Sequence, residues 1–388
     1  MMFPFRKQLA LYYHCIQLAR RYKGYSLSKR LSIMIDYHKL YRIKGLNANE
    51  YYEFEFESQD SVFRKTFLGL NEQRYYLDYL NPKKYYSLAR NKYIAHKMLE
   101  NTGVKKAHLY CYYQPEGVFV DSSEIASNIN DVYRILKSKN VSSCVIKDTE
   151  NSHGEGVIVI KSIEYLNDDC RLHCFNGKII KLSDVLGKHP LIFEGVIKQS
   201  KQVASFNESS VNTIRFMTTL YPNGEARVIA TFIKIGRDGK CVDNAGDGGN
   251  VDACIDIDSG QLKHVIQYDG IRKISDITHH PDSNNQLDGI VIDNWEQIKE
   301  QVIGFQKAFP YIKAAGWDIA ITDDGPIVIE VNDMWDRTGQ LFIRKGWREE
   351  IRECYQAWKK TGVKYPMYRQ NNLLSDSALK IISDYEWN

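Results

Sequence analysis

The chain contains 388 residues with a mass of 45.0 kDa, which is enough for two or three hydrophobic cores. Its hydrophobic fraction of 43% and charged fraction of 26% are those of an ordinary globular protein. The net charge of +4 is too small to indicate a nucleic-acid-binding protein, so we expect no nucleic acid among the partners.

The positive charge is concentrated at the start of the chain. Residues 1–50 hold ten Lys or Arg, but Asp36 and Glu50 are the only acids there, so this segment carries a charge of +8. Apolar residues recur at helical spacing over about 3–23 and again over 27–40. Two basic amphipathic helices can lie on an anionic membrane surface, or they can pack on the body of the protein with their charges in water. We favour packing and keep peripheral membrane contact as the alternative.

Cysteine usage and hydropathy indicate the compartment. The eight cysteines lack paired spacings and several lie in apolar runs, which is typical of reduced, buried thiols. The segment Cys170-Arg-Leu-His-Cys174 lacks a second ligand pair, so we interpret it as structural. The N-terminus has no signal-peptide cleavage site, and no apolar run reaches membrane-spanning length. We therefore predict a cytoplasmic protein, with peripheral contact at the inner membrane surface as the alternative.

An aromatic segment precedes the first candidate binding residue. Residues 50–90 are rich in aromatic side chains and irregular in pattern, which predicts a connecting lobe rather than a site. A helix is expected from Tyr93 to Glu100, with Lys92 at its start. A lysine there opposes the helix dipole unless an anion lies nearby. Lys92 is either an anion-binding residue or a solvated surface lysine.

The next motif is a lysine-bearing strand followed by a glycine-containing loop. The strand Val141–Lys147 leads into a loop with His153, Gly154 and Gly156, and the apolar strand 157–160 follows. A strand-borne lysine can neutralise phosphates while the backbone N–H groups of such a loop close over them. The glycines permit the backbone conformations that this requires. The alternative is a plain β-hairpin with glycines in its turn.

Two further strands carry polar groups. Residues 191–199 predict a strand that leaves the core as a linker, and its backbone can meet the edge of an adenine. Residues 211–220 predict a strand with Arg215 among apolar neighbours. A buried arginine needs an anion, which is either a phosphate or a structural carboxylate.

A strand from Glu225 to Ile235 is followed by Arg237 and by a loop rich in glycine and amide groups over residues 241–250. This loop can wrap phosphate oxygens through its N–H groups and Asn244, or it is a flexible surface turn. A helix is expected from Trp295 to Phe309.

A hairpin near the C-terminus carries the most informative polar groups. Turn residues at 322–326 separate two apolar strands, so a symmetric hairpin places Asp318 opposite Glu330, with Asn332 on the same face. Two carboxylates so close are costly to bury without a cation between them, and their oxygens suit Mg²⁺. The alternative is an exposed hairpin face. Residues 340–360 predict a helix.

Taken together, these motifs resemble the ATP-grasp superfamily, and most closely its sugar-transfer-associated branch. The phrases that carry the resemblance are Ser-Val-Asn-Thr-Ile-Arg215, Val-Asp-Asn244 with Gly248-Gly249, and Gly-Trp-Asp318 with Glu330-Val-Asn332. They span about residues 85–350 in an order that is specific to the superfamily.

The resemblance implies an α+β ATP-grasp fold in which two subdomains clamp Mg-ATP. Residues 1–85 would form a helical, aromatic N-terminal region and 86–190 the N-terminal subdomain with its phosphate-binding lid. Residues 191–360 would form the C-terminal subdomain with the magnesium site, and 361–388 a peripheral tail.

The resemblance also implies roles for individual residues. The phosphates would be held by Lys92 and Lys147, with His153, Gly154 and Gly156 in the lid. The adenine would meet the backbone at Glu194 and Val196, and the ribose would lie near Gln199. The magnesium ligands would be Asp318, Glu330 and Asn332. The γ-phosphate and the acceptor carboxylate would face Arg215, Arg237 and Asn244.

The resulting functional hypothesis is an ATP-dependent carboxylate–amine ligase that acts through an acyl phosphate. Its partners would be a carboxylate acceptor and an amine donor. By family association, the acceptor is a sugar acid of a surface polysaccharide, for example a uronic acid that is joined to an amino acid. Two alternatives stay open. One is a phosphotransferase acting on a sugar or a histidine, with His153 as its base. The other is a nucleotide-binding interaction protein of a glycan assembly complex.

Overall fold

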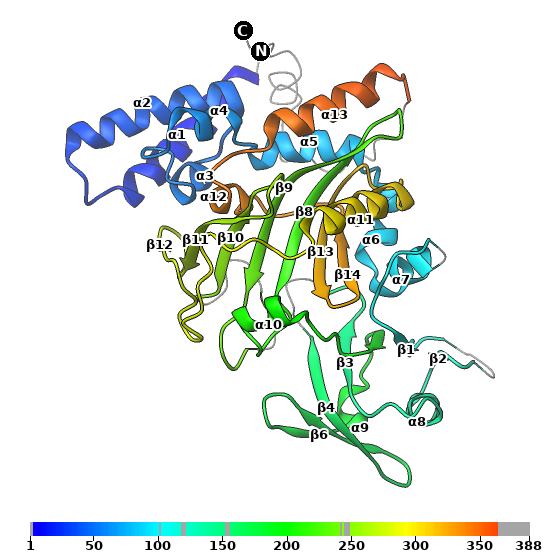
Figure 1. The fold of residues 1–388 in the computed structure, drawn as a ribbon. Helices are drawn as coiled ribbons and strands as arrows, with labels where there is room; N and C mark the ends of the chain where they lie inside the picture. The colour runs from blue at the N-terminus through cyan, green and yellow to red at the C-terminus, as the bar shows by residue number, and fades with distance from the viewer. Residues whose placement is uncertain are drawn as a thin grey trace.

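The computed structural model describes residues 3–100, 102–117, 122–151, 156–240, 243 and 249–363. These residues form two seven-stranded β-sheets with helices packed against them, and an added helical region at the N-terminus (Figure 1). The α+β class is therefore confirmed. Past Val363, the predicted peripheral tail lies outside the described residues.

The first sheet has the strand order β2-β1-β7-β3-β4-β5-β6. Its neighbours are antiparallel except for the parallel pair β1 and β2. Helix α8 packs on it by burying Val132, Ile135 and Leu136. The elements are β1 (Leu109–Tyr113), β2 (Ile125–Ala126), α8 (Ile129–Ser138), β3 (Cys144–Asp148), β4 (Ile158–Tyr165), β5 (Cys170–Cys174), β6 (Ile179–Lys181), α9 (Leu182–Val185) and β7 (Leu191–Glu194).

The second sheet has the order β12-β11-β10-β9-β8-β13-β14 and is antiparallel throughout. Helices α7 and α11 share a core with one face, whereas α5 and α13 share a core with the other (Figure 1). The strands are β8 (Thr213–Leu220), β9 (Ala226–Ile235), β10 (Val251–Ile255), β11 (Leu262–Tyr268), β12 (Ile274–Asp276), β13 (Ala314–Thr322) and β14 (Gly325–Asn332). The helices are α5 (Leu70–Leu80), α7 (Lys92–Glu100), α10 (Lys201–Phe206), α11 (Trp295–Ala308) and α13 (Arg348–Lys360).

The sheet pairing moves the predicted subdomain boundaries. Strand β7 pairs with β1 and β3, so the first sheet extends to Glu194 rather than ending at residue 190. The segment expected to begin the first subdomain belongs to the second one instead, because Ala95, Leu99 and Val104 are buried in the core of the second sheet. The segment from residue 86 to about 104 therefore packs with the C-terminal half, because the apolar face of α7 lies against it.

The N-terminal region is helical as predicted, and its helices pack on the body of the protein. Residues 50–90, expected to be irregular, are mostly helical, so that expectation was wrong. Their aromatic residues fill a shared core that includes Tyr51, Phe63 and Phe67. Capping supports the short helices, since the Asn47 side chain and Glu50 form a reciprocal capping box. The elements are α1 (Phe3–Arg21), α2 (Leu27–Lys44), α3 (Ala48–Glu53), α4 (Ser61–Thr66), η1 (Lys83–Tyr85) and α6 (Tyr86–Arg90).

The C-terminal helix that was predicted over residues 340–360 is divided in two. Helix α12 (Gly339–Phe342) ends before a loop, and α13 begins at Arg348. In that loop the backbone of Gly346 lies against Thr66, and a Cβ at this glycine would be 2.0 Å from the Thr66 carbonyl oxygen. The close approach requires glycine and joins the C-terminal segment to the N-terminal helices.

Two observations concern the predicted compartment. Among the described residues, no helix is long and apolar enough to cross a membrane. The seven cysteines in the described part of the chain are free, and five of them are buried.

Candidate active site

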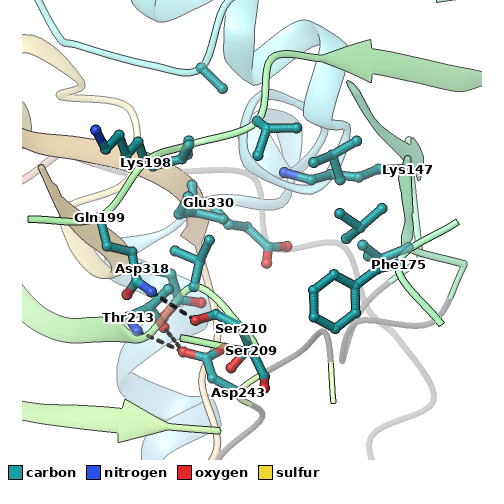
Figure 2. Close-up of a pocket in the computed structure, with 18 of the residues that line it drawn as sticks. Lys147, Phe175, Lys198, Gln199, Ser209, Ser210, Thr213, Asp243, Asp318 and Glu330 are labelled. Atoms are coloured by element: carbon teal, nitrogen blue, oxygen red, sulfur yellow. Dashed lines mark hydrogen bonds between the residues drawn. The ribbon is translucent and has the colours of Figure 1, made fainter. Parts of the chain in front are cut away.

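A cavity of about 690 Å³ lies between the two sheets. Its wall comes from β3 and β4 of the first sheet, from the linker after β7, and from β8, β9, β13 and β14 of the second sheet (Figure 2). This volume is in the range of small-ligand and cofactor sites. The cavity has a mainly apolar end and a polar end.

The apolar end is a slot between the sheets. Its side chains come from both sheets and include Val145, Val159, Phe175 and Ile329. The linker Gly195–Gln199 closes one side of the slot, and Gly195 donates its backbone N–H to the His108 carbonyl at 2.8 Å. Apolar walls beside an exposed backbone suit a flat heterocyclic base. Val196 therefore lies where the sequence placed it, in the linker wall.

Lys147 projects from β3 into the cavity and is held by a buried carboxylate. Its Nζ donates to Glu194 Oε2 at 2.7 Å, and His96 Nδ1 lies 3.8 Å from the other oxygen. Burial alone would raise the pKa of Glu194, but Lys147 and His96 outweigh burial and lower it to about 2. The Glu194 side chain therefore orients Lys147, while the strand backbone continues into the linker.

Lys92 lies at the first turn of α7 and also lines the cavity. Its Nζ donates to the Asn151 carbonyl and lies 3.9 Å from Glu330 Oε1. Burial lowers the pKa of Lys92, and the Glu330 carboxylate opposes that effect. A partly desolvated lysine at a helix start gains most from a bound anion, which favours the anion-binding alternative over a solvated surface lysine.

The predicted hairpin register is confirmed. Asp318 on β13 pairs with Glu330 on β14, and Gly316 pairs with Asn332. A bulge follows Asp318 on this pair of strands. The polar residues therefore lie on the face that the sequence indicated, above an apolar sheet core.

Asp318 is bound by two cations. Arg215 on β8 donates to both carboxylate oxygens at 2.7 and 2.9 Å, and Lys234 on β9 donates to Oδ1 at 2.9 Å. Burial would raise the pKa of Asp318, but the two cations lower it well below its usual range. The anion that a buried Arg215 requires is therefore this structural carboxylate.

The same contacts decide how the predicted magnesium ligands fit. A carboxylate offers four lone pairs, and the two cations occupy three of those of Asp318. Glu330 and Asn332 offer oxygens, since Lys92 contacts Glu330 only at 3.9 Å and Asn332 uses its Nδ2 to reach Gly316. Glu330, which lines the cavity, thus fits Mg²⁺ that is shared with phosphate oxygens, with one further position at Asp318. Asn332 lies on the same face of the hairpin but is not among the cavity residues. No cluster of three or more His, Cys, Asp or Glu that could hold a metal ion occurs in the described ranges.

The polar end of the cavity contains residues that the sequence did not single out. Thr213 donates from its N–H and its hydroxyl to Asp243 Oδ2, at 2.7 and 2.6 Å (Figure 2). Burial raises the pKa of Asp243. The hydroxyl of the buried Ser210 has no hydrogen-bond partner in the described structure. Lys234 had a detectable signal, because a lysine inside the apolar run 228–235 indicates a paired, buried charge.

The remaining predicted residues differ in where they lie. Gln199 lines the cavity, but its amide is bound to the Ser210 carbonyl and to the Asn212 N–H. Arg237 is not among the cavity residues and forms a bidentate ion pair with Asp282. Gly156 has φ of +75°, as a glycine of a tight loop should. Three predicted residues lie outside the described residues: His153, Gly154 and Asn244.

The sequence matches a family model described as sugar-transfer associated ATP-grasp over residues 71–355. This range contains both sheets, the linker and all the residues given above for the cavity wall. The chain belongs to the sugar-transfer associated ATP-grasp family. Members of the ATP-grasp superfamily are ATP-dependent ligases, and the family match agrees with the predicted cofactors ATP and Mg²⁺.

Among solved structures, the chain is similar to biotin carboxylase from Campylobacter jejuni, at 9% identity over 72% of this chain and 47% of that chain, with a TM-score of 0.39. It is also similar to N5-carboxyaminoimidazole ribonucleotide synthetase from Thermotoga maritima, at 11% identity over 71% and 52% of the two chains, with a TM-score of 0.38. A third is D-alanine–D-alanine ligase from Bacillus anthracis, at 14% identity over 71% and 70%, with a TM-score of 0.35.

The chain spans about half the length of the first two of these structures. At such identities and TM-scores the likeness carries no argument about substrates, and the family match alone identifies the chain. No curated protein matches the sequence.

Proposed function

We propose that this enzyme is a carboxylate–amine ligase that amidates a sugar acid, for example a uronic acid with an amino acid, in surface polysaccharide biosynthesis. In this reaction the acceptor carboxylate attacks the γ-phosphate of ATP and releases ADP. The amine then attacks the acyl phosphate, releases phosphate and forms the amide. The family description, sugar-transfer associated ATP-grasp, supports the sugar part of the proposal.

The observation that carries the proposal is the set of lysines around one cavity. Lys92, Lys147 and Lys234 all line it, and each is mostly buried. Charges that are fixed in a partly dry cavity stabilise a transferring phosphoryl group more than charges in water do. Because Glu194 and Asp318 already hold two of these lysines, little reorganisation accompanies the reaction.

The charged residues of the cavity wall suit the acyl-phosphate route. Acyl transfer through a phosphate needs only positioning, charge and exclusion of water. Mg²⁺ held by Glu330 would add charge neutralisation at the phosphates when bound.

The experiment is ADP release with and without each co-substrate. We expect ADP release to require a hexuronate. Repeated turnover should also require an amine. With hydroxylamine as the amine, a hydroxamate should accumulate. Lys147→Met should lose this activity at least a hundredfold. A phosphorylated sugar that forms without amine would establish the phosphotransferase instead, and nucleotide binding without turnover would establish the interaction protein.

We also propose that helices α1 and α2 contact an anionic membrane surface. Large apolar side chains on them are exposed, including Leu27 at 81%, Leu31 at 62% and Ile35 at 52%. Five exposed basic residues accompany them: Arg20, Arg21, Lys23, Lys29 and Lys39. The only acid in residues 11–41 is Asp36, which is paired with Arg64. Apolar and basic side chains together favour an interfacial position on anionic lipid.

A further inference from the structure

The polar end of the cavity differs in chemistry from the apolar end. Figure 2 shows Lys147 and Phe175 on one side of the cavity and Ser209, Ser210 and Asp243 on the other, with the Glu330 carboxylate between them. The first side offers apolar surface and a phosphate-binding cation. The second side offers hydroxyl groups and a carboxyl group, which suit a ligand rich in hydroxyls.

Ser210 is the most informative residue at this end. It is only 5% exposed, and its Oγ makes no hydrogen bond with any of the described residues. A buried hydroxyl without a partner is unfavourable, and a ligand hydroxyl beside it would supply the missing hydrogen bond. The position of Ser210 is fixed, because Gln199 donates to its carbonyl at 2.8 Å.

Lys234 supplies a positive charge to the same wall. Its ammonium group has three N–H donors, and one of them binds Asp318. Lys234 lines the cavity, whereas Arg215 is directed to Asp318 by two hydrogen bonds. An acceptor carboxylate beside Lys234 would gain an ion pair in a partly dry site.

We propose that Lys234, Ser210 and Asp243 form the acceptor subsite of the enzyme, and that this subsite takes a carboxylate that also bears hydroxyl groups, of the hexuronate class. The carboxylate pairs with Lys234, on the side of the cavity where Glu330 would face the nucleotide phosphates. A ring hydroxyl meets Ser210. This inference rests on the proposed ligase function, which supplies the reacting carboxylate. It adds that the acceptor binds at the polar end of the cavity and that Lys234 and Ser210 select it.

The test measures binding in two steps. In the first, Mg²⁺ and AMP-PNP are titrated into wild type, Ser210→Ala and Ser205→Ala by calorimetry. Ser205 is the matched control, because it lies in the same wall but its hydroxyl is bound to the Gln202 carbonyl. We expect all three proteins to bind the nucleotide within twofold. A tenfold loss for Ser210→Ala alone would mean that the ribose occupies this end, and the proposal would be overturned.

In the second step, proteins saturated with Mg²⁺ and AMP-PNP receive D-glucuronate, D-galacturonate, D-mannuronate, D-glucose or hexanoate. We expect wild type and Ser205→Ala to bind at least one hexuronate at least tenfold more tightly than glucose and hexanoate. Ser210→Ala should weaken that binding at least tenfold, since a site built to bind a hydroxyl discriminates strongly when the pair is broken. Equal binding of hexanoate, an unchanged affinity in Ser210→Ala, or no binding of any hexuronate overturns the subsite.

The outcomes for the subsite and for the ligase are separate. Hexuronate binding without amine-dependent ADP release would leave the subsite in place and reject the ligase. Amine-dependent turnover of another carboxylate, with no hexuronate bound, would retain the ligase and reject the subsite. Ser210→Ala should fold normally, because its hydroxyl has no partner within the described structure.

Discussion

Asp318 and Glu330 lie opposite each other on β13 and β14, but different cations hold them. Arg215 and Lys234 bind Asp318 at 2.7 to 2.9 Å, whereas Lys92 approaches Glu330 only to 3.9 Å. One carboxylate is therefore buried and paired, and its neighbour is available to a ligand. The two should respond differently to the same substitution.

Asp318→Asn should destabilise the fold. The change leaves two buried cations without their shared anion, and loss of one partner of a buried ion pair typically costs about 3 to 5 kcal/mol. Urea unfolding of Asp318→Asn and Glu330→Gln would measure the difference, with Glu330→Gln expected close to wild type. Equal stability of wild type and Asp318→Asn would show that the cluster contributes nothing to the fold.

Glu330→Gln should instead remove the magnesium dependence of nucleotide binding. The amide keeps the shape of the side chain but removes the charge that Mg²⁺ needs. The readout is the rise in melting temperature with AMP-PNP, measured with and without Mg²⁺. The control is Glu164→Gln, which changes an exposed carboxylate paired with Arg171 on β4 and β5. A full Mg²⁺-dependent shift in Glu330→Gln would reject this residue as a metal ligand.

The hairpin could be predicted from sequence because its information is local. A turn cluster and alternation of faces are sufficient to place Asp318 opposite Glu330. The partner of Arg215 could not be predicted, because it depends on the pairing of β8 with β13, which are about a hundred residues apart in the chain. Sequence reasoning correctly required an anion for Arg215 but left its identity open.

The misplaced boundaries have a similar cause. Strand β7 joins the first sheet through long-range pairing with β1 and β3, which no local pattern indicates. Lys234 was missed although it carries the same signal as Arg215, a charge inside an apolar strand. Asp243 and Ser210 carry no such signal, because short polar residues in loops are usually solvated. Their burial is a consequence of the tertiary fold.

Membrane contact predicts a lipid-selective interaction of α1 and α2. Vesicles that contain phosphatidylglycerol should sediment the protein at low salt, while phosphatidylcholine vesicles should not. Changing Leu27, Leu31 and Ile35 together to Ser should weaken this binding at least tenfold without loss of fold, because all three side chains are exposed. Ile179→Ser, at an exposed position on β6, is the matched control. Equal sedimentation of all variants would reject the contact.

Glu194 predicts an acid-dependent loss of stability. Burial raises the pKa of Glu194, but Lys147 more than offsets burial, so that the pKa in the folded protein is about 2. In an unfolded chain the pKa of a glutamate is about 4.3. Below the unfolded pKa, the unfolded chain binds the proton first, so stability that is present above pH 4.5 is lost as the pH falls toward 2. Between these two pKa values, the free energy of unfolding falls by roughly 3 kcal/mol.

Chemical unfolding of wild type and Glu194→Gln at pH 6, 4 and 3 measures this effect. Wild type should exceed Glu194→Gln at pH 6, and the gap should shrink by pH 3, because the carboxylate advantage is then partly lost. In Lys147→Met, the free energy of unfolding should depend less on pH than in wild type, since Lys147 is the main cation that lowers the Glu194 pKa. A gap that stays constant across this range would show that Glu194 is not held ionised by Lys147, and the orientation of Lys147 toward the phosphates would then need another support.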